Sequence, residues 1–221
     1  FGPEIGAAIK SAHERNGVAF HMQSGIDRLE GEGNVACAVL KDGSALDADF
    51  VLIAIGVEPV TGMIRGAQRL EDGSLAVDEY LRVAEDVFAA GDIASYPDPR
   101  SGGRIRIEHW RLAEQLGRCA AANMLGHKRK FTAVPFFWTQ QCGQRYDHAG
   151  YAPGWEEMIL HGDAAKPDFI AYYVKAGKVL AASAAKRDKQ MIAFMHLLGA
   201  GRLPDAAALK GEDIDLTRLV D

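Results

Sequence analysis

Hydrophobic residues recur at helical spacing in three stretches of the chain. These stretches are residues 3–16, 109–126 and 186–201, and each has an apolar face. Gly17 ends the first pattern and Gly199 the last, since glycine is common just after a helix. We therefore expect three helices, and the small residues along the second would let it lie close to a sheet or a ligand.

Shorter apolar runs predict β-strands between these helices. Residues 34–40 and 45–50 flank the tight-turn signal Asp42-Gly43, so we expect them to pair as a β-ribbon. Further strand patterns occupy residues 18–22, 72–83 and, as a hairpin turning at 176–178, 168–185.

Residues 50–56 are continuously apolar, which is typical of a strand buried on both faces of a sheet. We expect a second buried strand at residues 86–92, which stops at Gly91-Asp92. A helical pattern follows this second strand.

The composition of the sequence changes near residues 127–133, where we place a domain boundary. Beyond it the sequence is rich in aromatic residues and turns. We expect Trp155, Tyr172 and Tyr173 to lie in the core of this last region, together with Phe136 and Phe137. The polar tail from Pro204 is expected to be irregular.

Composition excludes several classes of protein. Of the 221 residues, 48% are hydrophobic and 25% charged, as in an ordinary globular protein, and no apolar run approaches the ~20 residues of a membrane helix. A net charge of −5 argues against nucleic-acid binding. The basic run 126–130 has two readings, which are favourable charge at a helix C-terminus or a docking patch for an acidic protein.

The three cysteines, Cys37, Cys119 and Cys142, form no CxxC pair. Such usage is typical of reduced thiols in a cytoplasmic protein, and the histidines do not cluster with cysteines or carboxylates. We predict neither a redox dithiol nor a metal site.

Asp92 is the first candidate for ligand chemistry. In open α/β sheets, ligands bind beyond the carboxyl ends of the strands, and a carboxylate there can accept hydrogen bonds from sugar hydroxyls. Gly91 would let the ligand approach the backbone. The alternative is an ordinary turn in which the Asp92 side chain bonds its own backbone. The dipeptide alone leaves both open.

The surrounding motifs favour the ligand. The stretch "AEDVFAAGDIA" resembles the second flavin motif of flavoproteins with two dinucleotide-binding domains, and "VLIAIGVEP" resembles the segment that crosses between those domains. The strings "PFFW", "AGYAPGW" and "GRLP" are similar to those of bacterial ferredoxin reductases and apoptosis-inducing-factor-like reductases, most of all the apoptosis-inducing-factor-3-like branch. The resemblance covers essentially the whole chain.

This resemblance implies roles for particular residues. Implied FAD contacts are Gly91, Asp92, Ile93, His109 and Trp110, and implied NAD(H) contacts are Gly56, Glu108 and Trp138. Two plainer readings stay open: Glu108 could favour a helix N-terminus, and Trp138 could be a core aromatic. Thr139-Gln140 stands where relatives often carry Ser-Asp, which removes a charge beside the nucleotide. We assign no catalytic acid or base.

No GxGxxG phosphate loop occurs in the sequence, although the implied fold needs two of them. We expect both loops to precede Phe1, in a longer protein. The expected architecture is α/β, a partial FAD/NAD(P) two-dinucleotide-binding fold plus a C-terminal α+β reductase domain. Residues 1–52 would complete an NAD(P)H domain, 53–132 an FAD domain, and 133–221 would form the reductase domain. This stretch alone is expected to bind FAD weakly or not at all, and to be inactive.

The resemblance implies an FAD-dependent NAD(P)H reductase that passes electrons to a ferredoxin, rubredoxin or Rieske-type iron–sulfur acceptor. It would act in the cytoplasm without nucleic acid or membrane, and a homodimer is left open. One alternative is a lipoamide-dehydrogenase-type disulfide reductase, although the His-Pro pair of that class is absent. Another is a non-catalytic interaction protein of the apoptosis-inducing-factor type.

Overall fold

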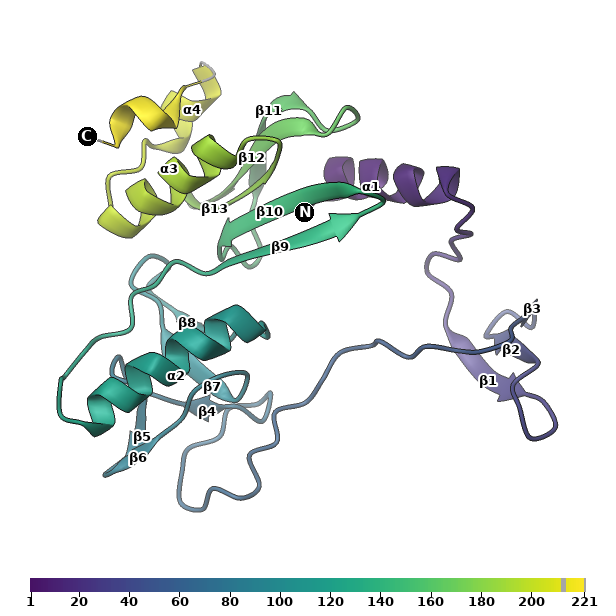
Figure 1. Ribbon diagram of the computed structural model, residues 1–221, viewed down its shortest axis with the longest axis horizontal. Helices are drawn as coiled ribbons and strands as arrows, with labels where there is room; N and C mark the ends of the chain where they lie inside the picture. Colours follow the sequence, from purple (N-terminus) through teal and green to yellow (C-terminus); the bar gives the residue numbers. More distant parts are fainter. Residues whose placement is uncertain (212–213, 221) are drawn as a thin grey trace. The chain divides into compact units, whose positions relative to one another are not determined.

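The computed structural model describes residues 1–211 and 214–220, which divide into two compact units. One unit is Glu14–Val57, and the other combines Phe1–His13 with Glu58–Asp221. Figure 1 labels their helices and strands along the chain. Within the described residues, no helix has both the length and the apolar character needed to cross a membrane.

The unit Glu14–Val57 is built on a three-stranded antiparallel sheet in the order β1-β2-β3. Its strands are β1 (Ile26–Glu30), β2 (Cys37–Leu40) and β3 (Ala45–Asp47). The expected β-ribbon is confirmed: Gly43 adopts φ +87°, and Asp42 accepts hydrogen bonds from the backbone and hydroxyl of Ser44. The strand expected at 18–22 is wrong, because these residues pair with no strand in the described chain and their side chains are exposed.

The buried strand expected at residues 50–56 is also wrong. The segment has no regular structure, and Leu52 and Ile55 are 80% and 91% exposed. A continuously apolar strand is buried only when other strands and covering layers surround it. The three-stranded sheet of this unit gives residues 50–56 neither neighbouring strands nor a covering layer, so this apolar segment is not buried.

The region from Glu58 to Phe131 of the larger unit combines two small sheets with one helix. Strands β4 (Leu75–Ala76) and β7 (Ala94–Pro97) are parallel, and β8 (Arg104–Ile105) is antiparallel to β7. The expected helix is confirmed as α2 (Trp110–Met124). The core between helix and sheets comprises Leu75, Val77, Leu81, Tyr96, Ile105, Leu112, Leu116, Cys119 and Phe131.

Residues 86–92 do not form the second buried strand that was expected. Only β6 (Val87–Phe88) is a strand, and it pairs antiparallel with β5 (Arg82–Ala84). Val87 is exposed, whereas Ala89 is buried. As with residues 50–56, the described chain offers no parallel neighbours on both sides.

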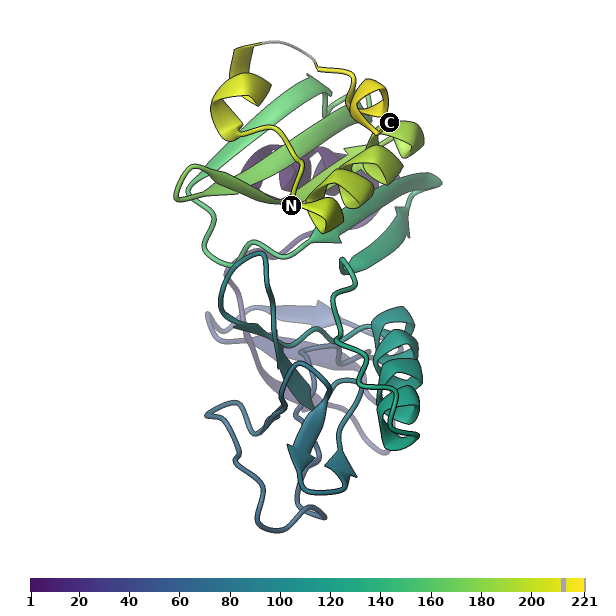
Figure 2. The same ribbon diagram turned by 90° about the vertical axis from the view of Figure 1, so that its left-hand side faces the viewer.

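A five-stranded antiparallel sheet forms the C-terminal region, in the order β11-β12-β13-β10-β9. The strands are β9 (Phe136–Gln141), β10 (Gln144–Gly150), β11 (Glu157–Asp163), β12 (Asp168–Lys175) and β13 (Lys178–Ala185). The last two confirm the predicted hairpin. Helix α3 (Asp188–Ala200) covers one face and α1 (Pro3–Arg15) the other, as Figure 2 shows.

Strand alternation explains how one sheet serves two helices. On β12, Tyr172 packs toward Phe194 of α3, whereas Phe169 packs toward Ile5 of α1. Both tyrosines expected in the core, Tyr172 and Tyr173, are buried. Trp155, Phe136 and Phe137 are only partly buried.

Two expectations for the C-terminal end are wrong. Helix α3 continues through Gly199 and ends at Gly201, whose φ of +67° is the left-handed conformation of a helix C-cap. The described part of the tail is not irregular, since it holds α4 (Ala206–Gly211) and the 3₁₀ helix η1 (Leu216–Leu219). Leu209 and Leu216 are fully buried, and they anchor these turns where the sequence looks polar.

Candidate functional site

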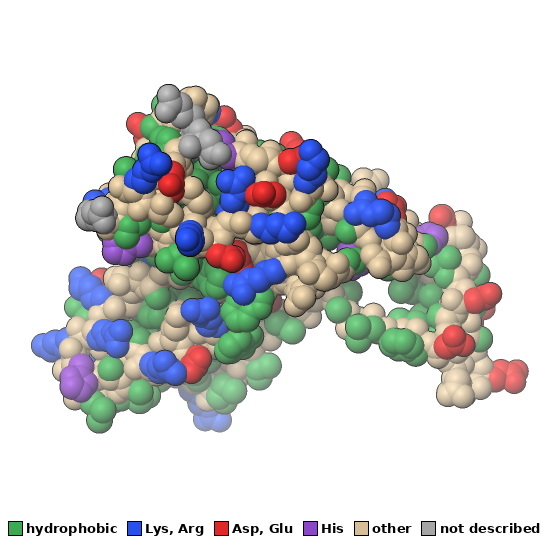
Figure 3. All heavy atoms as spheres, turned by 45° about the horizontal axis from the view of Figure 1, so that its top comes forward, with side chains coloured by type: hydrophobic (Ala, Val, Ile, Leu, Met, Phe, Trp, Pro, Cys, Tyr) green, Lys and Arg blue, Asp and Glu red, His purple; other side chains and the backbone are tan. Residues whose placement is uncertain are grey.

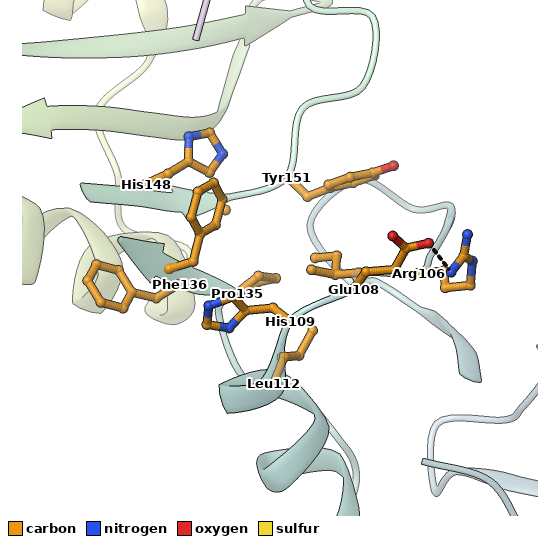
Figure 4. Close-up of a pocket in the computed structure, with 11 residues that line it drawn as sticks. Arg106, Glu108, His109, Leu112, Pro135, Phe136, His148 and Tyr151 are labelled. Atoms are coloured by element: carbon orange, nitrogen blue, oxygen red, sulfur yellow. Dashed lines mark hydrogen bonds and ion pairs between the residues drawn. The ribbon is translucent and has the colours of Figure 1, made fainter. Parts of the chain in front are cut away.

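A pocket of about 360 Å³ opens between the segment before α2 and strands β9 and β10. Figure 4 shows that side chains from both sides face it. Its walls are mostly apolar, with a few polar groups among them. The lining residues are Arg106, Ile107, Glu108, His109, Leu112, Pro135, Phe136, Phe137, His148, Gly150 and Tyr151.

Arg106 organises the polar side of this pocket. Its Nη1 donates to Glu108 Oε1 at 2.7 Å and to the backbone oxygen of Asp92 at 3.2 Å, while its Nε donates to Asp72 Oδ2 at 2.7 Å. Partial burial disfavours the guanidinium charge, but the bonds to Glu108 and Asp72 outweigh it and raise the pKa of Arg106. The arginine thus fixes the Glu108 carboxylate relative to the turn at Asp92.

Asp72 is held ionised mainly by Ser74, and Arg106 adds to the effect. Hydrogen bonds from Ser74, followed by those of Arg106, lower the pKa of Asp72 to about 2. Asp72 therefore stays an anionic partner of Arg106 well below neutral pH.

Gly91 and Asp92 lie at the turn that Arg106 contacts. Gly91 has φ +81°, which favours glycine, and Asp92 is exposed. Asp42 and Asp72 each bond the residue two positions later, but the carboxylate of Asp92 has no hydrogen-bond or ionic partner among the described residues. The turn-capping bond of the plainer reading is therefore not present, and the carboxylate is available to a ligand. Ile93 is partly buried against the core beneath.

The start of α2 is open to a hydrogen-bond acceptor. His109 is the N-cap residue, yet its side chain makes no capping bond, and the first intrahelical bond runs from Ala113 N to His109 O. The His109 Nδ1 is buried without a partner. An uncapped helix start attracts negative charge and carbonyl-type acceptors. These features fit a flat ligand that carries acceptors along one edge.

Trp110 and Trp138 lie beside the pocket and do not line it. Their rings meet edge to face at 6.2 Å, and Trp138 is 38% exposed, so it is not a core aromatic. The guanidinium groups of Arg145 and Arg111 lie 5.3 Å and 5.9 Å from the Trp138 ring centroid. A cationic aromatic surface therefore adjoins the pocket.

The sequence-predicted site residues are thus only partly brought together. Glu108 and His109 line the pocket, and Asp92 is tied to Glu108 through Arg106. Gly56 belongs to the unit Glu14–Val57, where it is exposed with φ +104°.

Sequence reasoning missed Arg106 and His148. Arg106 stands two residues before Glu108, so the two side chains extend from the same side of an extended segment, and that spacing was a usable signal. His148 carries no such signal, because only strand pairing brings it to the pocket.

The basic run 126–130 follows α2, and its backbone forms hydrogen bonds with the last turn of that helix. The backbone of His127 donates to Ala122 O beyond Gly126, and Arg129 N donates to Asn123 Oδ1. Lys130 pairs with Glu79 at 2.8 Å. On the face drawn in Figure 3, basic side chains are interspersed with acidic ones. The described residues bring no three His, Cys, Asp or Glu side chains together as metal ligands.

Two family models match the chain. Residues 1–117 match the model described as pyridine nucleotide-disulphide oxidoreductase, and residues 136–220 match the reductase C-terminal model. Apoptosis-inducing factor 3 of Homo sapiens is 32% identical over 220 residues, which cover 97% of this chain and 36% of the relative. The 5,5'-dehydrodivanillate O-demethylase ferredoxin reductase subunit of Sphingobium sp. is 31% identical, covering 99% and 54%.

Solved structures share the fold. The ferredoxin reductase for the CYP199A2 system from Rhodopseudomonas palustris superposes with a TM-score of 0.89 at 24% identity, covering 100% of this chain and 55% of that one. Fdr9 gives 0.73 at 29% identity, with 87% and 50% covered. The chain spans about a third to about half of the length of these relatives.

Proposed function

The chain belongs to the pyridine nucleotide-disulphide oxidoreductase family, and from that premise we propose that the protein is an FAD-dependent NAD(P)H oxidoreductase. Its electrons would pass to an iron–sulfur acceptor of the ferredoxin kind. The observation that carries the proposal is the open start of α2. There an uncapped helix N-terminus and the unpartnered His109 Nδ1 border an apolar pocket beside Glu108.

These residues suit FAD. The free carboxylate of Asp92 would accept hydrogen bonds from the ribityl hydroxyls, and Gly91 and Ile93 would lie against the same chain. The backbone at His109 and Trp110 would face the acceptor edge of the ring. When bound, FAD supplies acceptance of a hydride from NAD(P)H and release of single electrons.

Three residues are proposed for NAD(H): Glu108, Trp138 and Gly56. Glu108 is held in place by Arg106, and Trp138 offers an exposed ring for stacking. We also propose that residues 1–52 belong to an NAD(P)H domain, 53–132 to an FAD domain, and 133–221 to the C-terminal reductase domain.

The names of several relatives support a ferredoxin as acceptor. They include the anthranilate 1,2-dioxygenase system ferredoxin–NAD(+) reductase component of Burkholderia cepacia. One solved structure with a similar fold is the covalent putidaredoxin reductase–putidaredoxin complex. A rubredoxin or Rieske acceptor, a homodimer and a cytoplasmic location stay predictions. A disulfide reductase is disfavoured, since the sequence holds no His-Pro pair for its acid–base step.

The test is reduction of an acidic [2Fe–2S] ferredoxin by NADH, with the FAD-loaded full-length protein as catalyst and the absorbance of the cluster as readout. We expect steady reduction far above that of reactions lacking enzyme or lacking FAD. Ferricyanide, a small acceptor that needs no docking surface, serves as the parallel assay. If ferricyanide is reduced and neither a ferredoxin nor a rubredoxin is, the proposed acceptor class is wrong; if neither assay runs, the oxidoreductase proposal is wrong.

A further inference from the structure

A series of three polar contacts, one buried and two partly buried, leads from the pocket wall into the C-terminal sheet. His148 Nδ1 lies 2.8 Å from Ser183 Oγ on the neighbouring strand β13. Ser183 Oγ lies 2.9 Å from the hydroxyl of Tyr173, which in turn lies 2.9 Å from the backbone oxygen of Phe1. Ser183 and Tyr173 are buried, so water does not replace the contact between their two hydroxyls.

The number of protons available to this series of hydrogen bonds determines the tautomer of His148. A backbone oxygen only accepts, so Tyr173 must donate its single proton to Phe1. Ser183 must then donate to Tyr173, because the Tyr173 proton is already used. The remaining contact needs a proton from His148, so Nδ1 carries the hydrogen.

The other ring nitrogen of His148 is therefore an acceptor. Burial, followed by the positive charge of the Phe1 amino group, lowers the pKa of His148 to about 4, so the ring is neutral near pH 7 and Nε2 keeps its lone pair. Nε2 has no hydrogen-bond partner among the residues that the structure describes. It belongs to a ring that lines the pocket, stacked at 5.0 Å on Phe137.

Two residues with an acceptor atom, His148 and Glu108, line the pocket from opposite sides, as Figure 4 shows. Between them lie apolar groups, among them Pro135 and Phe137. Between these two residues, a flat, neutral ring that bears N–H donors would give each acceptor a partner.

We propose that His148 Nε2 accepts a hydrogen bond from the carboxamide N–H of the nicotinamide ring, which makes His148 a specificity residue for the dinucleotide. This assignment rests on the proposed function, since it takes NAD(P)H as the substrate of the site. Nicotinamide combines a flat ring with the two N–H donors of its carboxamide, and those donors would pair with the acceptors of the two walls. Ser183 and Tyr173 act as positioning residues, because they hold the tautomer and do not touch the ligand.

The tautomer is tested directly by ¹H–¹⁵N NMR of the protein labelled at histidine. We expect His148 to show a protonated Nδ1 and an unprotonated Nε2 near neutral pH, and Ser183→Ala to lose this preference. A protonated Nε2 in the unsubstituted protein would remove the acceptor and overturn the proposal, whatever the activity of the loaded enzyme.

The ligand is tested by comparing NADH with its 3-acetylpyridine analogue, in which a methyl group replaces the carboxamide NH₂. His148→Phe keeps a ring of similar shape but lacks the acceptor. Since one neutral hydrogen bond is lost, we expect KM for NADH to rise about three- to tenfold while KM for the analogue changes less than about twofold. His196→Phe, the same substitution at an exposed position of α3, should change neither value.

The outcomes separate the two proposals. Equal effects on both dinucleotides, or no effect, overturn the role of His148 while ferredoxin reduction stands. A loss of bound FAD without a selective effect on NADH points to the flavin as the donor and also overturns it. Failure of the unsubstituted protein to oxidise NADH ends both proposals. If His148→Phe does not fold, Ser183→Ala decides, with a smaller selective rise expected in KM for NADH.

Discussion

Arg106 connects the turn at Asp92 to the pocket carboxylate of Glu108 through hydrogen bonds of 3.2 Å and 2.7 Å. Neither residue would be fixed by its own backbone alone, since both lie in irregular segments outside the strands. A third bond, to Asp72, balances the arginine with two carboxylates. A single side chain therefore determines how two candidate cofactor contacts lie relative to each other.

At the residue scale, His148 also predicts a dependence of stability on pH. An unfolded histidine has a pKa near 6.5, and burial lowers the pKa of His148 to about 4. As pH falls from about 6.5 to about 4, His148 binds a proton in the unfolded chain but stays neutral in the folded chain. The free energy of unfolding should fall over this window, by up to about 3 kcal/mol, and stay level below it as far as His148 is concerned.

Urea unfolding at several pH values measures this contribution. The control is His148→Phe, which cannot titrate and should lose that part of the pH dependence. A variant as sensitive to acid in this window as the unsubstituted protein would mean that another group is responsible.

At the element scale, helices and hairpins with local signals were predicted correctly. α2 and the β12–β13 hairpin depend on spacing and turn chemistry within one stretch of chain. The end of α3 was predicted at the wrong glycine. The helix continues through Gly199, where an added Cβ would meet only Val134, and it ends at Gly201, which has the left-handed conformation. Composition could not tell which glycine adopts that conformation.

Two glycine substitutions should therefore have opposite effects. Gly201→Ala places a side chain in the left-handed region, and we expect it to lower the free energy of unfolding by about 1 kcal/mol. Gly117→Ala lies inside α2, where an added Cβ meets nothing within 4 Å, and it should raise that free energy by about 0.5–1 kcal/mol. Thermal unfolding of both variants measures the difference, and effects of equal sign would contradict the assignment of the α3 cap.

At the scale of the whole molecule, burial follows partners that lie far away in sequence. The C-terminal sheet is buried because α1 covers one face and α3 the other. The tail gains structure in the same way: His161 Nε2 bonds Leu209 O, and Leu209 fills the core beneath α4.

Removing this anchor should be costly. Leu209→Ala leaves a cavity at a fully buried position, and we expect it to lower the free energy of unfolding by about 2–4 kcal/mol in urea. Leu219→Ala, at a position 36% exposed, should cost less than about 1 kcal/mol. A loss at Leu209 no greater than that at Leu219 would show that the tail is not part of the cooperative core.

The sequence by itself determined what depends on neighbours along the chain. It identified helices and hairpins, because spacing and turn chemistry act within a few residues. Its motifs, by their resemblance to known reductases, also indicated the α/β class and the pyridine nucleotide-disulphide oxidoreductase family. Only the tertiary structure decided that residues 50–56 are exposed, that Arg106 joins Asp92 to Glu108, and that His148 lines the pocket. Burial, ion pairing and a tautomer all depend on groups far away in sequence, and no local pattern records which groups the fold will bring together.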